Sequence, residues 1–192
     1  MKIIDISVDP FTTPPYPGDP DPRFRWLSRV EQGAEYSLSI FGMTPHAGTH
    51  VDAPLHYLRG GTAADDIPLE NCYGACTVVT LEGILTGEDM DKLLPHCRKR
   101  LIIRGNGKAS LELSAARVIA DYKMLLIGID AQSVAFDAQE GDVHRELLRG
   151  GVVILENLDL TDAPDGEYVL SALPLKLGSM EAAPTRAVLI TK

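Results

Sequence analysis

The sequence has little of what disulfide-rich or membrane-bound proteins need. Its three cysteines are an odd number with no Cys-x-x-Cys spacing, which argues against a disulfide framework or a zinc ribbon and leaves ordinary reduced thiols. No apolar run reaches the roughly eighteen residues of a membrane span, and charge appears too early for a signal peptide. We therefore expect a cytoplasmic protein with no membrane partner.

Positive charge is also scarce. The chain has 18 Lys and Arg residues against 27 Asp and Glu residues, which gives a net charge of -9. Nucleic acid and anionic membrane surfaces favour basic patches, so no nucleic-acid partner is expected and a small-molecule substrate is the more natural one. With 192 residues, 45% of them hydrophobic, the chain predicts a single globular domain over 1–192.

Histidine is rare too, yet three of the five histidines lie within the stretch 46–56. His46, His50, Asp52 and His56 stand there, with few competing surface residues between them. A single histidine or aspartate is usually a surface group, but four such donors together favour a metal or catalytic site. Imidazole and carboxylate are the ligands that Zn²⁺ and its borderline neighbours prefer.

The spacing of this cluster is compatible with one shared site. All four donors stand at even positions, so an extended segment would project them toward one face. Gly48, Thr49 and Pro54 disfavour a regular helix, which places the cluster on a strand end or a structured loop. Gly48 also allows the backbone to approach a ligand or another strand closely.

Apolar segments elsewhere alternate between strand and helix patterns, which predicts an α/β fold. The proline-rich segment 10–22 is expected to be an ordered loop or a surface arm. The segment 168–177 is expected to add a hairpin or an antiparallel edge. Strands are expected at 1–8, 38–43, 75–81, 101–104, 124–129, 152–155 and 187–191, and helices at 86–94, with Thr86 as its cap, 114–123 and 144–149.

Two more donors lie downstream of the cluster. His144 stands at the start of an expected helix, and Glu156 directly follows the expected strand 152–155. Groups beyond the carboxyl ends of strands often form sites in α/β proteins. A catalytic zinc takes about three protein ligands, so these two residues could hold a second ion if one carboxylate bridges.

The motif His-x-Gly-Thr-His-x-Asp-x-Pro-x-His at 46–56 resembles the signature of the cyclase-like metal-dependent hydrolases. This family includes bacterial kynurenine formamidase (arylformamidase) and the isatin hydrolases. The length of 192 residues resembles that of the formamidase branch more than that of the longer isatin hydrolases. The resemblance covers nearly the whole chain, through Tyr16-Pro17-Gly18-Asp19-Pro20, Gly128-Ile129-Asp130 followed by Ser133, Glu156-Asn157-Leu158, Leu173-Pro174-Leu175 and Ala183-Pro184-Thr185-Arg186-Ala187.

The resemblance implies a swivelling β/β/α domain that assembles as a homodimer or homotetramer. It implies two Zn²⁺ ions, or Mn²⁺, per subunit, and hydrolysis of N-formylkynurenine or a similar aryl formamide by metal-activated water. In the implied site His56 is the general acid and base. One ion is held by His46, His50 and Asp52, and the second by His144 and Glu156, with Asp52 shared and Glu156 also bridging.

Several positions depart from the family, among them Ala131-Gln132 before Ser133 and Ala135-Phe136 after it. Tyr16 stands where kynurenine formamidases commonly have Trp, and its ring could still stack on an aryl substrate although its polar tip and size differ. Two alternatives therefore stay open. One is a hydrolase or cyclase with the same site acting on another small amide, lactam or lactone, as the isatin hydrolases do. The other, ranked last because His56 is present, is a non-catalytic metal-binding or small-molecule-binding protein.

Overall fold

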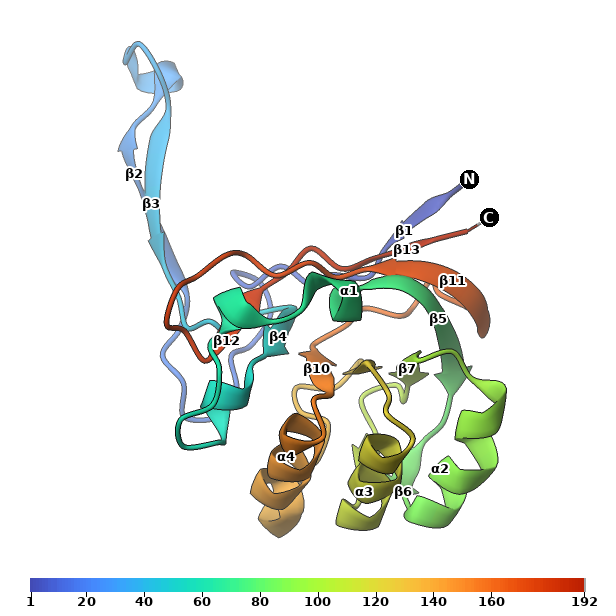
Figure 1. Cartoon of the computed structure of the whole chain (residues 1–192). Helices are drawn as coiled ribbons and strands as arrows, with labels where there is room; N and C mark the ends of the chain where they lie inside the picture. The colour runs from blue at the N-terminus through green and yellow to red at the C-terminus, as the bar shows by residue number, and fades with distance from the viewer. Residues whose placement is uncertain (192) are drawn as a thin grey trace.

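The computed structural model describes residues 1–191, and its centre is a curved mixed sheet (Figure 1). The strand order is β1-β13-β11-β5-β7-β9-β10-β4-β12, with β5, β7, β9 and β10 parallel to one another and the other pairs antiparallel. The strands are β1 (Ile3–Asp5), β4 (His50–Asp52), β5 (Tyr73–Thr80), β7 (Arg100–Arg104), β9 (Leu126–Ile129), β10 (Val153–Glu156), β11 (Gly166–Ser171), β12 (Ala182–Pro184) and β13 (Val188–Ile190).

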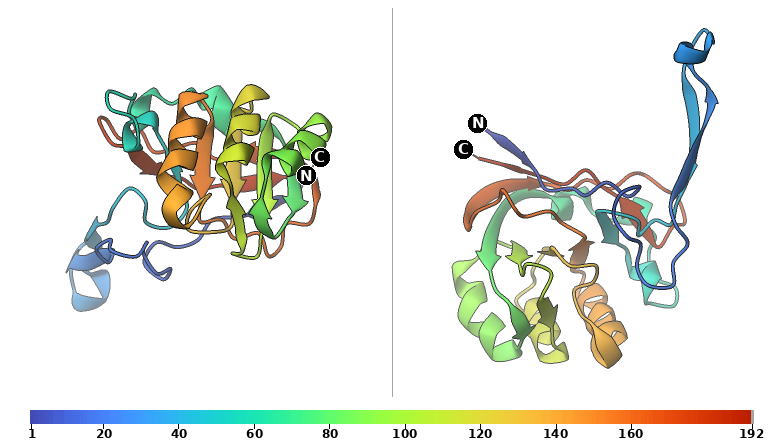
Figure 2. Two further views of the ribbon diagram at one scale, coloured as in Figure 1. Left: turned by 90° about the horizontal axis from the view of Figure 1, so that it is seen from below. Right: turned by 180° about the vertical axis from the view of Figure 1, so that it is seen from behind.

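Three helices lie side by side on one face of this sheet, as the front view (Figure 1) and the view from below (Figure 2) both show. They are α2 (Gly87–Leu93), α3 (Leu113–Asp121) and α4 (Glu140–Arg149), and a single turn, α1 (Leu69–Cys72), precedes β5. The predicted cap of α2 is confirmed. Thr86 accepts from the backbone of Asp89, whose carboxylate accepts from the backbone of Thr86, so both ends of a capping box are present.

Alternation along the central strands builds two hydrophobic cores. On β7, Leu101 and Ile103 pack toward the helices, while Ile102 packs into the core on the opposite face. On β10, Ile154 faces the helices and Leu155 the other side. Successive side chains of a strand point to opposite faces, so strands that are apolar throughout must be covered on both sides. The expected buried strands at 101–104, 124–129 and 152–155 are confirmed in this way.

The remaining short elements lie outside the large sheet. A small parallel pair joins two short strands, and five single 3-10 turns connect larger elements. They are β6 (Gly83–Leu85), β8 (Ala109–Leu111), η1 (Val30–Gln32), η2 (Pro54–His56), η3 (Ala64–Asp66), η4 (Leu94–His96) and η5 (Asp137–Gln139).

An arm projects away from the body (Figures 1 and 2). It is the antiparallel hairpin of β2 (Arg23–Ser28) and β3 (Leu38–Gly42). The proline-rich segment 10–22 leads into it without forming a helix or a strand, as predicted. Phe11 packs edge-on against Phe24 and Phe41, with ring centroids 5.4 and 6.1 Å apart, and so fixes the base of the arm.

Two sequence expectations need correction. The segment 168–177 adds neither a hairpin nor an edge, because β11 lies inside the sheet between β5 and β13. The edge on this side is β1, which pairs with β13. The last helix begins at Glu140, four residues earlier than expected, so His144 lies in its second turn. Glu140 and Asp142 favour that earlier start because acidic groups interact well with a helix N-terminus.

Within residues 1–191, no helix combines the length and the apolar character needed to cross a bilayer. Cys72 and Cys76 are buried free thiols, and burial raises their pKa values to about 11 and about 12. Both therefore stay protonated at neutral pH, which agrees with ordinary reduced thiols rather than reactive ones.

Candidate metal centre

The pairing of β4 with β10 places three donors on one face of the sheet. Glu156 lies opposite His50 and Ile154 lies opposite Asp52. Directly paired residues point to the same face, and Ile154 belongs to the core under the helices. His50, Asp52 and Glu156 therefore all point toward the helix side, and all three are buried.

His46 and His56 reach the same place from outside the strand. His46 lies in the turn before β4, and His56 ends η2, which begins at Pro54. The cluster therefore lies on a short strand and the structured loops that flank it, as the sequence predicts, and Pro54 starts a 3-10 turn directly after the strand. The loop is tight: Gly48 has a φ of 69°, and a Cβ there would lie 3.0 Å from Pro10, so glycine allows the close approach that the sequence predicts.

His144 comes from α4, below this end of the sheet. Its ring stacks on that of Tyr57, with centroids 4.6 Å apart and planes inclined by 30°. Its Nε2 lies 3.3 Å from Glu156 Oε1 and 3.7 Å from Asp52 Oδ2. The structure thus brings together His144 and the strand residues, which are far apart in the sequence.

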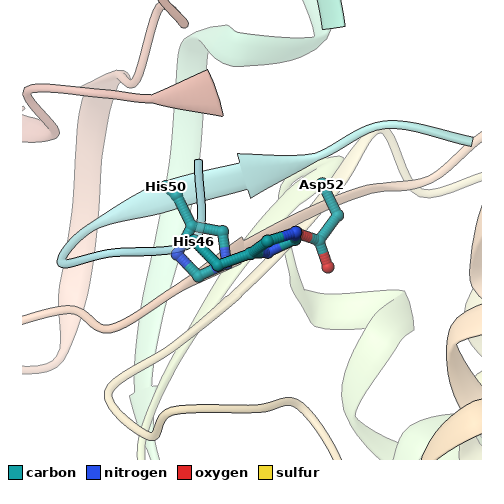
Figure 3. A group of neighbouring side chains, drawn as sticks. All are labelled: His46, His50 and Asp52. Atoms are coloured by element: carbon teal, nitrogen blue, oxygen red, sulfur yellow. The ribbon is translucent and has the colours of Figure 1, made fainter. Parts of the chain in front are cut away.

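The donor atoms form two sets that share Asp52. The side chains of His46, His50 and Asp52 point toward one another (Figure 3), and Asp52 Oδ1 lies 3.2 Å from His46 Nδ1 and 3.4 Å from His50 Nε2. Asp52, His144 and Glu156 form the second set, and within each set the donor atoms lie within 4.8 Å of one another. Glu156 Oε2 also lies 3.5 Å from His50 Nε2, so this carboxylate spans both sets.

Backbone carbonyls fix the orientation of two imidazole rings. His50 Nδ1 lies 2.9 Å from the carbonyl of Gly48, and His144 Nδ1 lies 2.8 Å from that of Glu140. A carbonyl only accepts, so each Nδ1 must carry the proton, and each Nε2 is directed at the carboxylates. Metal-binding histidines are commonly oriented by such a bond to the other ring nitrogen. The backbone N–H of Val134 donates to Glu156 Oε1 at 2.8 Å and holds that carboxylate as well.

The chemistry of this donor set fits divalent metal. Both oxygens of Asp52 and the Nε2 atoms of His46 and His50 are buried without a hydrogen-bond partner among residues 1–191. Buried polar atoms are rarely left in this way, because the cost is about 1 to 3 kcal/mol each. Ligands bound about 2.0 to 2.2 Å from a tetrahedral zinc lie about 3.3 to 3.6 Å apart. The N···O separations of 3.2 to 3.7 Å match that spacing.

Electrostatics also favour positive charge here. Burial disfavours an imidazolium at His50, but the Asp52 and Glu156 carboxylates outweigh it and raise the His50 pKa to about 10. At His144 burial is again outweighed, chiefly by Glu156, and the pKa rises to about 9. Burial alone would raise the pKa of Asp52, but the neighbouring imidazoles of His46 and His50 hold it well below its usual value. Without metal, protons on His50 and His144 supply the positive charge that balances the Asp52 and Glu156 carboxylates.

These shifts predict a pH dependence that metal abolishes. Because the folded-state pKa values of His50 and His144 lie above 6.5, their stabilisation is complete below pH 6.5 and is lost as the pH rises through about 9 to 10. The unfolding temperature of chelator-treated protein should therefore fall over this range. Metal-loaded protein should not show this fall, since metal replaces the protons. Parallel curves for the two forms in calorimetry would contradict the prediction.

His56 lies beside the two sets with its ring unbonded. Its centroid is 4.3 Å from that of His46 and 6.1 Å from that of His144, and the ring makes no hydrogen bond within residues 1–191. Burial lowers the pKa of His56, so the ring is mainly neutral at pH 7. A neutral, half-buried imidazole next to a metal site can accept a proton and return it.

A cavity of about 130 Å³ opens onto these residues. Its lining includes His56 and Tyr16, so the structure places the predicted substrate-binding residue at the site. Sequence reasoning missed Glu140, whose carboxylate accepts the hydroxyls of Tyr16 at 2.8 Å and Ser133 at 2.9 Å. The spacing in the sequence could have identified Glu140, because it stands four residues before His144 and residues four apart share one face of a helix.

Sequence reasoning also missed Glu181. Its carboxylate lies 3.6 Å from His46 Nε2, on the side of the ring away from Asp52. No motif marks this residue in the sequence, since it reaches the site only because β12 pairs with β4. A carboxylate in this position can orient a metal-binding imidazole.

A larger cavity of about 460 Å³ adjoins the other side of the motif loop, but its polar groups are already paired. Arg186 pairs with Asp5, the Ser7 hydroxyl donates to the carbonyl of Ala187, and the Thr49 hydroxyl donates to the carbonyl of Asn157. The smaller cavity is therefore the better candidate, because it contains the unpartnered donors.

Comparison with known proteins gives the family and the fold of this chain. The Cyclase family model matches residues 4–135. A kynurenine formamidase from Salinibacter ruber is 36% identical, over 98% of this chain and 97% of that protein. The solved structure of a potential metal-dependent hydrolase with cyclase activity matches with a TM-score of 0.83 and 30% identity, over 98% of this chain and 96% of that one. Isatin hydrolase A from Labrenzia aggregata shares the fold at a TM-score of 0.81 and 19% identity, over 100% of this chain and 94% of that one. The predicted swivelling β/β/α fold class is confirmed.

Proposed function

The chain belongs to the Cyclase family and is a metal-dependent amidohydrolase acting on carbon–nitrogen bonds other than peptide bonds, and we propose that its substrate is N-formylkynurenine or a similar aryl formamide. The observation that carries this proposal is the pair of donor sets sharing Asp52, next to the free imidazole of His56. The formamidase relatives, at 34 to 36% identity over nearly their whole length, favour a formamide over a lactam.

We assign the metal ligands by the two donor sets. His46, His50 and Asp52 would hold one divalent ion, and His144 and Glu156 the second, with Asp52 shared and Glu156 bridging. Zinc fits the imidazole and carboxylate ligands, and manganese is the alternative. When bound, such a metal acidifies water and polarises the carbonyl that is attacked.

The other residues perform the proton transfers and hold the substrate. Water adds to the formyl carbon, the carbon–nitrogen bond breaks, and formate and an aryl amine are released. A ring nitrogen of His56 takes the proton from water and returns it to the departing nitrogen. The cavity, at about 130 Å³, is smaller than the roughly 300 to 1,000 Å³ that encloses a drug-sized ligand, so it encloses only the reacting end of the substrate. The aromatic ring would then contact Tyr16 at the cavity opening.

The test is turnover by protein of known metal content. Metal is removed with a chelator, zinc or manganese is restored, and hydrolysis of N-formylkynurenine is compared with that of isatin and simple lactams. We expect restoration to two ions per chain to restore formamide hydrolysis. Hydrolysis of a lactam but not of any formamide would replace the proposed substrate with the cyclic one. Full metal content without turnover of any substrate would overturn the proposal.

We propose that the chain assembles as a homodimer or homotetramer through its arm. Phe24, Trp26, Ile40 and Phe41 are 47 to 61% exposed on a hairpin that projects from the body (Figure 1). An isolated two-stranded hairpin is marginally stable in water, and exposed apolar patches of this kind mark interfaces. A second copy covering the arm would bury these side chains.

If the arm forms the interface, a charged substitution on it should change both the mass of the assembly and the tryptophan fluorescence. Phe41→Glu should convert the assembly to monomer, because a carboxylate would be buried without a partner. Trp26 is the only tryptophan in the chain and lies on the arm, so its emission should shift to longer wavelength at the same time. Ile84→Glu, at a 72% exposed residue outside the arm, is the control and should leave the mass unchanged. Light scattering after size-exclusion chromatography gives the mass, and a monomeric wild-type protein would refute the assignment.

A further inference from the structure

Two carboxylates in the cavity have no cationic partner. Glu140 accepts the hydroxyls of Tyr16 and Ser133, and Asp19 accepts the hydroxyl of Thr44 at 3.5 Å. All these donors are neutral. Among the described residues that line the cavity there is no lysine or arginine, and neither carboxylate forms an ion pair within residues 1–191. Both carboxylates therefore line the cavity wall without a salt bridge.

Burial separates the inner end of the cavity from its opening. His50, His144 and Glu156 are at most 4% exposed, whereas Asp19 and Glu140 are half-buried and Tyr16 is 36% exposed. The ligand sets thus lie at the inner end, and Asp19 and Glu140 lie toward solvent. A substrate whose amide reaches the inner end must place its remaining groups beside these two carboxylates.

Neither of these outer carboxylates is a proposed metal ligand. In the proposed assignment Asp52 and Glu156 bind metal directly, while Asp19 and Glu140 belong to neither donor set. The hydrogen bond to Glu140 raises the pKa of Tyr16 to about 12, so the hydroxyl stays neutral and donates to the Glu140 carboxylate. Charges on a half-buried wall attract opposite charge and repel like charge more strongly than exposed charges do.

We propose that Glu140, together with Asp19, selects substrates that carry an ammonium group on the part of the molecule remote from the amide, and disfavours those that carry a carboxylate there without an ammonium group. This inference rests on the proposed function, because it assumes that the amide occupies the metal centre. Glu140 acts as a specificity-determining residue and takes no part in the proton transfers. Its hydrogen bonds keep the carboxylate and the Tyr16 ring in place at the opening.

Three matched formanilides test the proposal, with an aminomethyl, a methyl or a carboxylate group at the same ring position. We measure kcat/KM for each, and by calorimetry the affinity of metal-loaded protein for the three corresponding anilines. Wild-type protein should prefer the ammonium compound to the carboxylate compound by about tenfold or more in both measurements, as expected for a charge-assisted contact. Added salt should reduce the preference.

Glu140→Gln keeps an oxygen that can accept the Tyr16 hydroxyl but removes the charge. It should lower the ammonium-to-carboxylate ratio about tenfold, and Asp19→Asn should lower it in the same direction. Glu88→Gln, at an exposed residue on α2, is the matched control and should leave the ratio unchanged. Metal content is measured for every variant.

The outcomes separate this inference from the proposed function. Preferential binding of the ammonium aniline, lost in Glu140→Gln, supports the inference even if no formanilide is hydrolysed, in which case only the proposed function fails. Equal binding of the three anilines by wild-type protein overturns the inference even if formanilides are hydrolysed. A wild-type preference that survives in both Glu140→Gln and Asp19→Asn also overturns it.

Discussion

Replacing Asp52 with Asn is expected to remove metal from both donor sets at once. The substitution keeps the size of the side chain but removes the charge that the two sets share. Asp52 is 1% exposed, and its two oxygens are directed at His46 and His50 on one side and at His144 on the other. Among residues 1–191, Asp52 is the one residue common to the two sets, and Glu156 of the second set also approaches His50 of the first at 3.5 Å. Bound metal should fall below one ion per chain, as measured by elemental analysis.

Turnover by Asp52→Asn should fall by about 10³-fold or more. Substitutions that only orient metal ligands typically cost about 10 to 100-fold, and loss of a shared ligand must cost more. Asp65→Asn, at an exposed residue of η3, is the control and should retain both metal and activity. If Asp52→Asn kept two ions per chain, the shared position of Asp52 would be wrong.

His56→Ala is expected to separate catalysis from metal binding. His56 belongs to neither donor set, so metal content should stay at the wild-type value. Turnover should fall by about 10² to 10⁴-fold, the usual contribution of a general acid and base. The control is His96→Ala, because His96 is exposed at the end of η4 and distant in sequence from the motif.

The pH profile checks the same role. Burial lowers the pKa of His56 below 6.5, and a base must be unprotonated, so wild-type turnover should rise with pH through a value below 6.5. His56→Ala should lack this rise. If the variant lost metal, or kept both its rate and the rise, His56 would not be the proton carrier.

The local sequence pattern was sufficient to predict most of the helices and strands of the fold. The buried strands β7, β9 and β10 are apolar on both faces, and the capping box at Thr86 fixes the start of α2, so both kinds of element could be located from nearby residues alone. The errors arose where distant segments decide. β11 is an interior strand only because the two chain ends pair beyond it, and no local residue records that pairing.

For the site, too, local sequence identified the donors, and contacts between distant segments determined their arrangement. The motif identified four donors, but their arrangement depends on the register of β4 against β10, which places Glu156 beside His50. Glu140 and Glu181 escaped notice because carboxylates are common in an acidic chain, and only their position makes them distinctive. The roles of these residues in metal binding and proton transfer stay predictions until the substitutions are made.

By itself, the sequence determined which ligands this protein offers, because the motif supplies imidazole and carboxylate donors that suit a metal and carries the resemblance to the metal-dependent hydrolases. Only the tertiary structure decided that the donors form two sets around one buried carboxylate, and that Glu140 and Asp19 lie together in the lining of the cavity. The physical reason is the distance along the chain over which each property is determined. Ligand type is a property of each side chain, whereas a shared ligand and the electrostatics of a cavity depend on distances between segments that the chain brings together only by folding.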